Sequence, residues 1–182
     1  DPNISVDEDP SLDIALATLD NETFVVAWID DTNTDFFFQV LHTNGTNVSG
    51  PISVATNADG TGSRISATAI NETTFIIAWT DNGDGSSNSE DAEAAWYHRD
   101  GSNVVSAFEV DTDLGNSGAN YRVDVSLAVH SDRYYVCHID DQDNDFDAGS
   151  FAFTSPSTND GDIQLDAGAG TAGTAVTSGT NT

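Results

Sequence analysis

The sequence has no lysine and very little positive charge. Its 182 residues include 31 Asp and Glu but only four Lys and Arg, all arginine, so the formal net charge at pH 7 is -27. A phosphate backbone or an anionic lipid surface would repel such a chain. We therefore exclude nucleic acid as a partner.

Long apolar runs and cysteine pairs are also missing. No run of about 18 apolar residues occurs, which predicts no membrane insertion. The one cysteine, Cys137, lies in an apolar run and cannot form an intramolecular disulfide, so we expect a buried thiol. The chain begins at Asp1 with neither methionine nor a basic and apolar leader, and we expect a mature secreted product with an extracellular or cell-surface location.

Catalytic signatures are a third absence. The sequence has no Gly-X-Ser-X-Gly elbow, no lysine-bearing phosphate loop and no Cys-X-X-Cys pair. We therefore expect no enzyme. Glycoside hydrolysis stays as the least favoured alternative, because that chemistry needs only two carboxylates.

The acidic residues themselves are strongly biased toward the shorter side chain. Of the 31, 25 are Asp and six are Glu. Aspartate favours turns and oxygen-rich metal loops over helix surfaces. The bias argues against helices, and adaptation to high salt is a second explanation for the acidity.

Three similar apolar runs recur along the chain: FVVAWID at 24–30, FIIAWTD at 75–81 and YYVCHID at 134–140. Their first residues lie 51 and 59 positions apart, which indicates a unit of about 50 residues with room for an insertion. Each run is short and rich in β-branched and aromatic residues, as in a strand buried on both faces.

Each run belongs to a set of four predicted strands. An alternating strand precedes it across a polar turn, which predicts an antiparallel hairpin, and an Asp-rich loop, a third strand, a turn and a fourth strand follow. The predicted strands are 12–19, 24–30, 36–42 and 51–56 in the first unit, 64–70, 75–81, 93–99 and 107–112 in the second, and 122–129, 134–140, 149–154 and 162–167 in the third.

The sequence thus predicts an all-β fold with three four-stranded repeats, either propeller-blade-like or in a β-sandwich. The repeats would span 10–59, 60–115 and 116–167. An extra strand would precede them at 1–9, and an uncharged Gly/Thr tail would follow at 168–182.

A family resemblance rests on FVVAWID followed by FFFQV, then Asn44-Gly45, Val48, Gly50 and a closing ISVAT. This pattern resembles the propeller-like repeats of large secreted bacterial and archaeal proteins, many of them calcium-dependent adhesins and surface proteins. It covers about residues 10 to 155, and in the third unit Cys137 and His138 replace the Ala-Trp pair. The resemblance implies an extracellular β architecture and names no ligand.

The loop after the second strand of each unit carries spaced oxygen ligands. Calcium takes six to eight oxygens, and carboxylates two residues apart in a tight turn can supply them. The alternative interpretation is a solvated Asp/Asn turn. The candidate calcium ligands are Asp31, Asn33 and Asp35, then Asp81 and Asp84, then Asp141, Asp143 and Asp145.

Three tryptophans allow a second functional interpretation. Trp28 and Trp79 lie in runs that are apolar on either side, so we predict core positions for them. Trp96 lies on a more alternating strand and is our candidate for an exposed contact with a glycan. A carbohydrate-binding module is therefore the main alternative function.

The ends of the chain suggest self-assembly. Ile4-Ser5-Val6-Asp7 matches the predicted fourth strands although no unit precedes it. Such a strand can pair with the sheet edge of a neighbour, with Ile4 and Val6 buried there. We expect an extracellular structural protein, a calcium-stabilised filament, matrix or adhesin subunit, whose partners are copies of itself joined by strand addition.

Overall fold

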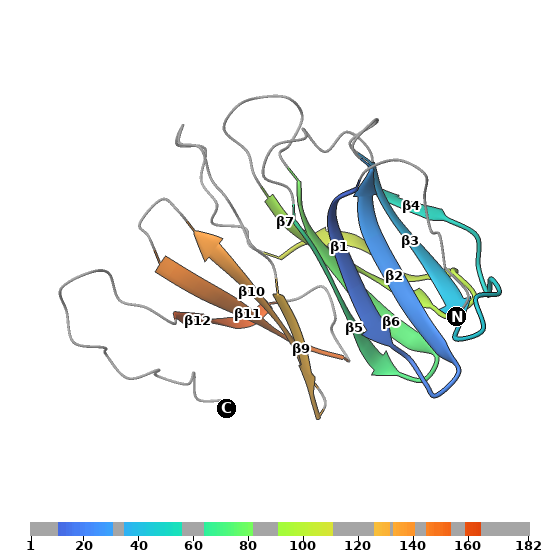
Figure 1. Ribbon diagram of the computed structural model, residues 1–182. Coiled ribbons are helices and arrows are strands. Elements are labelled where there is room, and N and C mark those ends of the chain that lie inside the picture. The colour runs from blue at the N-terminus through green and yellow to red at the C-terminus, as the bar shows by residue number, and fades with distance from the viewer. Residues whose placement is uncertain are drawn as a thin grey trace.

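The protein folds into β-sheets, as seen in a computed structural model (Figure 1). The expectation of an all-β chain is confirmed, and the described residues include no helix long and apolar enough to cross a membrane. The structure describes residues 11–30, 35–55, 64–81, 91–110, 126–131, 133–140, 145–153 and 159–164.

Within these described residues, twelve strands form three four-stranded sheets, each built from consecutive antiparallel strands in chain order. The first sheet contains β1 (Ser11–Thr18), β2 (Thr23–Asp30), β3 (Asp35–His42) and β4 (Ile52–Ala55). The second contains β5 (Ile65–Asn71), β6 (Thr74–Asp81), β7 (Asp91–His98) and β8 (Asn103–Glu109). The third contains β9 (Ser126–His130), β10 (Arg133–Asp140), β11 (Asp145–Ala152) and β12 (Asn159–Gln164).

Two predicted boundaries in the third sheet are wrong. β11 begins at Asp145, four residues before the predicted strand, because its whole length pairs with β10. β12 begins at Asn159, three residues before the predicted strand at 162–167, and Asn159 pairs there with Phe151. In both places ladder pairing overrides the turn preference of Asp, Asn and Gly.

Four turns of the first and second sheets share the same side-chain chemistry. Asp20 and Asn71 accept hydrogen bonds from the residues that follow them in the β1–β2 and β5–β6 turns. Asn44 and Asp100 do so in the β3–β4 and β7–β8 turns, where Gly45 and Gly101 adopt positive φ. These turns account for part of the Asp and Asn content.

The first and second sheets pack face to face around the larger core. The first sheet contributes Val25, Ala27 and Ile29 of β2 with Phe36, Phe38 and Val40 of β3. The second sheet contributes Ile65, Phe75, Ile77, Trp79, Ala95 and Tyr97. Successive residues of a strand point to opposite faces, so this interface uses every second position of β2, β3 and β6.

The opposite face of the second sheet packs on the third sheet. Ile76, Ala78, Ala94 and Trp96 meet Tyr134 and Val136 of β10 in a second core. The second sheet is therefore apolar on both faces, as its continuous apolar run predicts.

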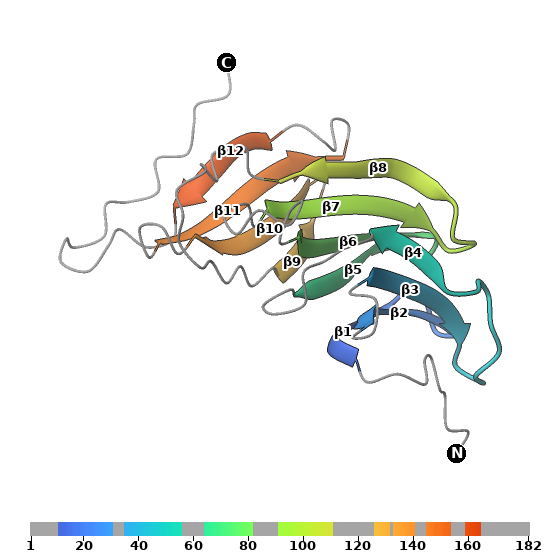
Figure 2. The ribbon, with the colours of Figure 1, turned by 90° about the horizontal axis from the view of Figure 1, so that it is seen from above.

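The three sheets follow one another in space in chain order (Figure 2). The first strand of each sheet lies beside that of the next, because β1 contacts β5 and β5 contacts β9. This order leaves one face of the first sheet outside both inter-sheet cores.

Candidate functional site

The predicted calcium loops begin and end on pairs of aspartates that face each other across two strands. Asp30 pairs with Asp35 in the first sheet, Asp81 with Asp91 in the second, and Asp140 with Asp145 in the third. The same position thus carries the same pair three times. Like charges directly opposite each other on neighbouring strands are destabilising, and the structure describes the side chains of one of these pairs, Asp30 and Asp35.

The structure places only three of the predicted ligands. Asp35 and Asp145 are the first residues of β3 and β11, and Asp81 is the last residue of β6, so each lies where a strand joins its predicted calcium loop. The described residues form no group of three or more metal-ligating side chains by themselves. The other predicted ligands lie outside the described residues: Asp31, Asn33, Asp84, Asp141 and Asp143.

Asp91, Asp30 and Asp140 are the partners that the sequence prediction did not select. Each is the strand residue opposite a predicted ligand, and only the strand register reveals that pairing. Asp30 is also 8% exposed, which is low for a carboxylate.

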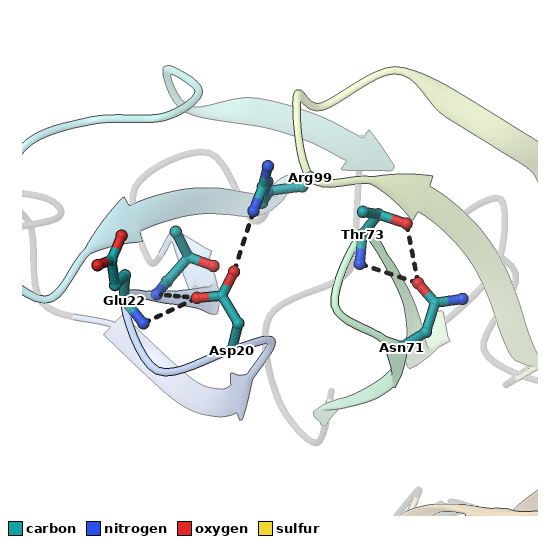
Figure 3. A network of polar contacts seen from close by, with 6 residues as sticks. Asp20, Glu22, Asn71, Thr73 and Arg99 are labelled. Atoms are coloured by element: carbon teal, nitrogen blue, oxygen red, sulfur yellow. Dashed lines mark hydrogen bonds and ion pairs between the residues drawn. The ribbon is translucent and has the colours of Figure 1, made fainter.

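A polar contact joins the first two sheets at one end (Figure 3). Asp20 Oδ1 accepts hydrogen bonds from the backbone N–H groups of Glu22 and Thr23 at 2.8 and 2.7 Å, and Asp20 Oδ2 accepts one from Arg99 at 3.0 Å. The hydrogen bond from the backbone N–H of Glu22 is the largest cause that lowers the pKa of Asp20, and Thr23 and then Arg99 lower it further. One of the four arginines thus links the β1–β2 turn to the β7–β8 turn.

A second carboxylate joins the first strands of the same two sheets. Asp13 Oδ1 accepts from the backbone N–H of Ile14 at 2.9 Å, and Oδ2 accepts from that of Ile65 at 3.1 Å. Near the β7–β8 turn, Gly101 lies against Ile52 and Ser49 of the first sheet. The contacts between sheets are therefore specific as well as apolar.

The outer face of the first sheet, opposite to its core with the second sheet, is also apolar. Ile14, Trp28 and Phe37 lie in register across β1, β2 and β3, as do Thr18, Phe24 and Leu41. Leu16 and Val26 lie between these rows, opposite Gln39. Ile14 and Leu16 are 56% and 65% exposed, whereas Val26 and Trp28 are buried.

The tryptophan predictions are two-thirds right. Trp28 and Trp79 are 2% and 0% exposed, which confirms their core positions. The prediction of an exposed Trp96 is wrong, because this residue is only 6% exposed. Its ring packs edge-on against the rings of Tyr134 and Phe153, with ring centroids 5.4 and 5.5 Å apart. The third sheet covers a face that strand alternation alone assigns to solvent.

The two predicted assembly residues, Ile4 and Val6, lie outside the described residues, and so does the tail at 168–182. The sequence contains a signal for the apolar outer face that our prediction did not include: Ile14 and Leu16 alternate with smaller residues in β1. No protein family, curated protein or solved structure matches this chain.

Proposed function

We propose that this chain is an extracellular structural protein, a calcium-stabilised subunit of a filament, matrix or adhesin. The observation that carries the proposal is the serial packing of three four-stranded sheets, in which apolar side chains join one sheet to the next. Such a fold serves to build an extended, rigid body, and its acidic charge of -27 keeps it soluble and attracts cations.

Within this proposal, the three sheets are three copies of one repeat and stand to one another like propeller blades. The register supports that interpretation. Trp28 and Trp79 each pair with an isoleucine of the preceding strand, Ile14 and Ile65. Contacts between successive sheets, such as β1 with β5 and β5 with β9, are the kind on which repeat proteins rely.

Calcium is the proposed ligand at the loop mouths, because an aspartate pair recurs there in all three sheets. The two carboxylates of Asp30 and Asp35 would supply part of the six to eight oxygens, and the predicted ligands Asp31 and Asn33 would supply others. Calcium would then stabilise the fold by binding the folded state alone.

Thermal unfolding tests this proposal. With calcium at 100 times its Kd, the stabilisation is about 2.7 kcal/mol, a rise in Tm of roughly 5–11 °C for a chain of this size. Asp35→Asn should reduce the rise, whereas Asp100→Asn, in the exposed β7–β8 turn, should leave it intact. An equal Tm with calcium, with magnesium and with excess chelator would refute calcium stabilisation.

Self-assembly is the second part of the proposal, with strand addition through Ile4 and Val6 as its expected route. Carbohydrate binding remains the alternative function. It has less support now, since none of the three tryptophans offers a ring to solvent. An exposed aromatic platform is the usual means of stacking on a sugar.

A further inference from the structure

The outer face of the first sheet matches the face of the second sheet that is buried in the larger core. In the first sheet Ile14 pairs with Trp28, and in the second sheet Ile65 pairs with Trp79. One step along, Leu16 pairs with Val26, as Ala67 pairs with Ile77. The two faces therefore carry apolar side chains at the same register positions.

The matched isoleucines differ sharply in exposure. Ile65 is 5% exposed because the first sheet covers it, whereas Ile14 is 56% exposed. Leu16 beside it is 65% exposed. Among the described residues, the other large apolar side chain with high exposure is Val104, 41% exposed on β8. Two of these three exposed residues thus lie on β1, on the outer face of the first sheet, whereas Val26, Trp28 and Leu41 of β2 and β3 on that same face are buried.

The cover over Ile65 shows what kind of surface fits such a face. It is a four-stranded sheet that presents mainly apolar side chains there, among them Val25, Ala27, Phe36 and Phe38, while Asp13 accepts a hydrogen bond from the backbone N–H of Ile65. A sheet face of this kind covers several strands at once and excludes water from the isoleucine. An acidic peptide or a sugar would have to bury polar groups against these apolar side chains without hydrogen-bond partners, which is unfavourable.

The other end of the same stack offers a further sheet face, on which Arg133 and Tyr135 of β10 lie together because successive residues of a strand point to opposite faces. Tyr134 and Val136 of β10 face the second sheet, so Tyr135 between them points to the far face of the third sheet, where it is half-buried. Ala128 lies opposite Tyr135 on β9 and is exposed. The far face of the third sheet stands where a fourth sheet would continue the series.

We propose that the outer face of the first sheet binds the far face of the third sheet of a second copy of this chain. The contact continues the stacking that already joins the three sheets within one copy. It is heterologous, so repeated addition builds a polar array. The inference rests on the proposed structural role and gives it a mode of assembly through sheet faces, in place of strand edges.

Charge sets the condition under which this contact forms. Each copy carries a net charge of -27, so two copies repel strongly at low ionic strength. At roughly 0.5 M NaCl the Debye length falls to about 4 Å, and the apolar contact then decides the outcome. Association should therefore increase with salt.

Sedimentation velocity on the full chain, at rising protein concentration in high salt and in calcium, tests the proposal. We expect the wild type to form a series of oligomers. The double variant Ile14→Glu and Leu16→Glu should weaken association by about tenfold or more, because it places charge at the contact. Val104→Glu is the control for a single added charge, to be compared with Ile14→Glu alone, because it makes the same kind of change at an exposed aliphatic residue of the second sheet, and it should associate like the wild type.

A mixing experiment tests the head-to-tail geometry. Tyr135→Asp should also block growth, but from the other end. A mixture of the Tyr135→Asp chain with the Ile14/Leu16 double variant should form dimers and stop there, because each has one intact face. Circular dichroism and Tm confirm that every variant is folded.

Each other outcome overturns the proposal in a distinct way. Oligomers that persist in the double variant would exclude this face and leave the structural role standing, with strand addition as the route. Dimers of Tyr135→Asp alone that depend on Ile14 would show a symmetric pairing of two outer faces. A wild type that stays monomeric in every condition would show that a segment of the same polypeptide covers the face, and would refute self-assembly as well.

Discussion

The matched isoleucines of the first two sheets permit a controlled test of the packing. Ile65→Ala and Ile14→Ala make the same chemical change at the same register position, opposite Trp79 and Trp28. They differ in surroundings, since Ile65 is 5% exposed and Ile14 is 56% exposed. A difference in their effects on stability therefore measures the burial by the neighbouring sheet.

The expected magnitudes follow from that exposure. Replacing a fully buried isoleucine by alanine costs about 2–5 kcal/mol, from lost transfer free energy and the cavity left behind. Ile65→Ala should accordingly cost about 3 kcal/mol and lower Tm by roughly 6–12 °C. Ile14→Ala removes mostly hydrated surface and should cost about 1 kcal/mol or less.

Urea unfolding of dilute protein at low ionic strength is the appropriate assay, because self-association would bury Ile14 and raise its cost. The free energies of unfolding are compared at unchanged m, so that a shift in midpoint reports stability alone. Equal costs for the two substitutions, or a larger cost for Ile14→Ala, would refute the packing of the first sheet over Ile65.

Two further predictions concern the turns at the same interface. Gly101→Ala should cost about 1–2 kcal/mol from its positive φ, and more from the contact of the new methyl with Ile52, whereas Gly50→Ala, with nothing within 4 Å, should change Tm little. The pKa of Asp20 is lower in the folded state than in the unfolded state. The ionised carboxylate therefore stabilises the fold fully above the unfolded-state pKa of about 4. This stabilisation is lost as the pH falls through the lower pKa of the folded state. The stability gap between wild type and Asp20→Asn should therefore be full at pH 7 and shrink below about pH 4 in urea melts, and a gap that does not change with pH would contradict the role of the charge.

Local pattern was enough to predict the strands because each buried strand carries its own signal. FVVAWID and FIIAWTD are continuous apolar runs, and both became strands with two buried faces. The polar residues between runs also predicted hairpins correctly, since Asp20 and Asn71 stabilise those turns by local hydrogen bonds. Local chemistry of this kind depends little on the rest of the fold.

Burial between sheets could not be predicted in the same way. Trp96 lies on a strand that also carries Glu93 and His98, yet the third sheet covers it. Ile14 and Ile65 show the converse, because equivalent positions differ in exposure according to whether another sheet lies above them. The contact of Arg99 with Asp20 joins residues 79 positions apart and has no local signature.

For the candidate calcium sites, the sequence indicated the loops and the structure added the register. Asp35, Asp81 and Asp145 were predicted from their spacing. Each of them lies opposite a second aspartate on the neighbouring strand, and this depends on which residues pair between the two strands. Pairing follows from loop length and strand alignment, which spacing alone does not determine.

The order of strands within the sheets has a consequence for how the chain folds. Each sheet is built entirely from consecutive strands, so its pairings close short loops and cost little chain entropy. As the chain leaves the ribosome, β1 to β4 can form a complete sheet before β5 is made, and that sheet then presents a finished template to the next. The same holds for β5 to β8 and for β9 to β12, so the molecule can assemble one sheet at a time.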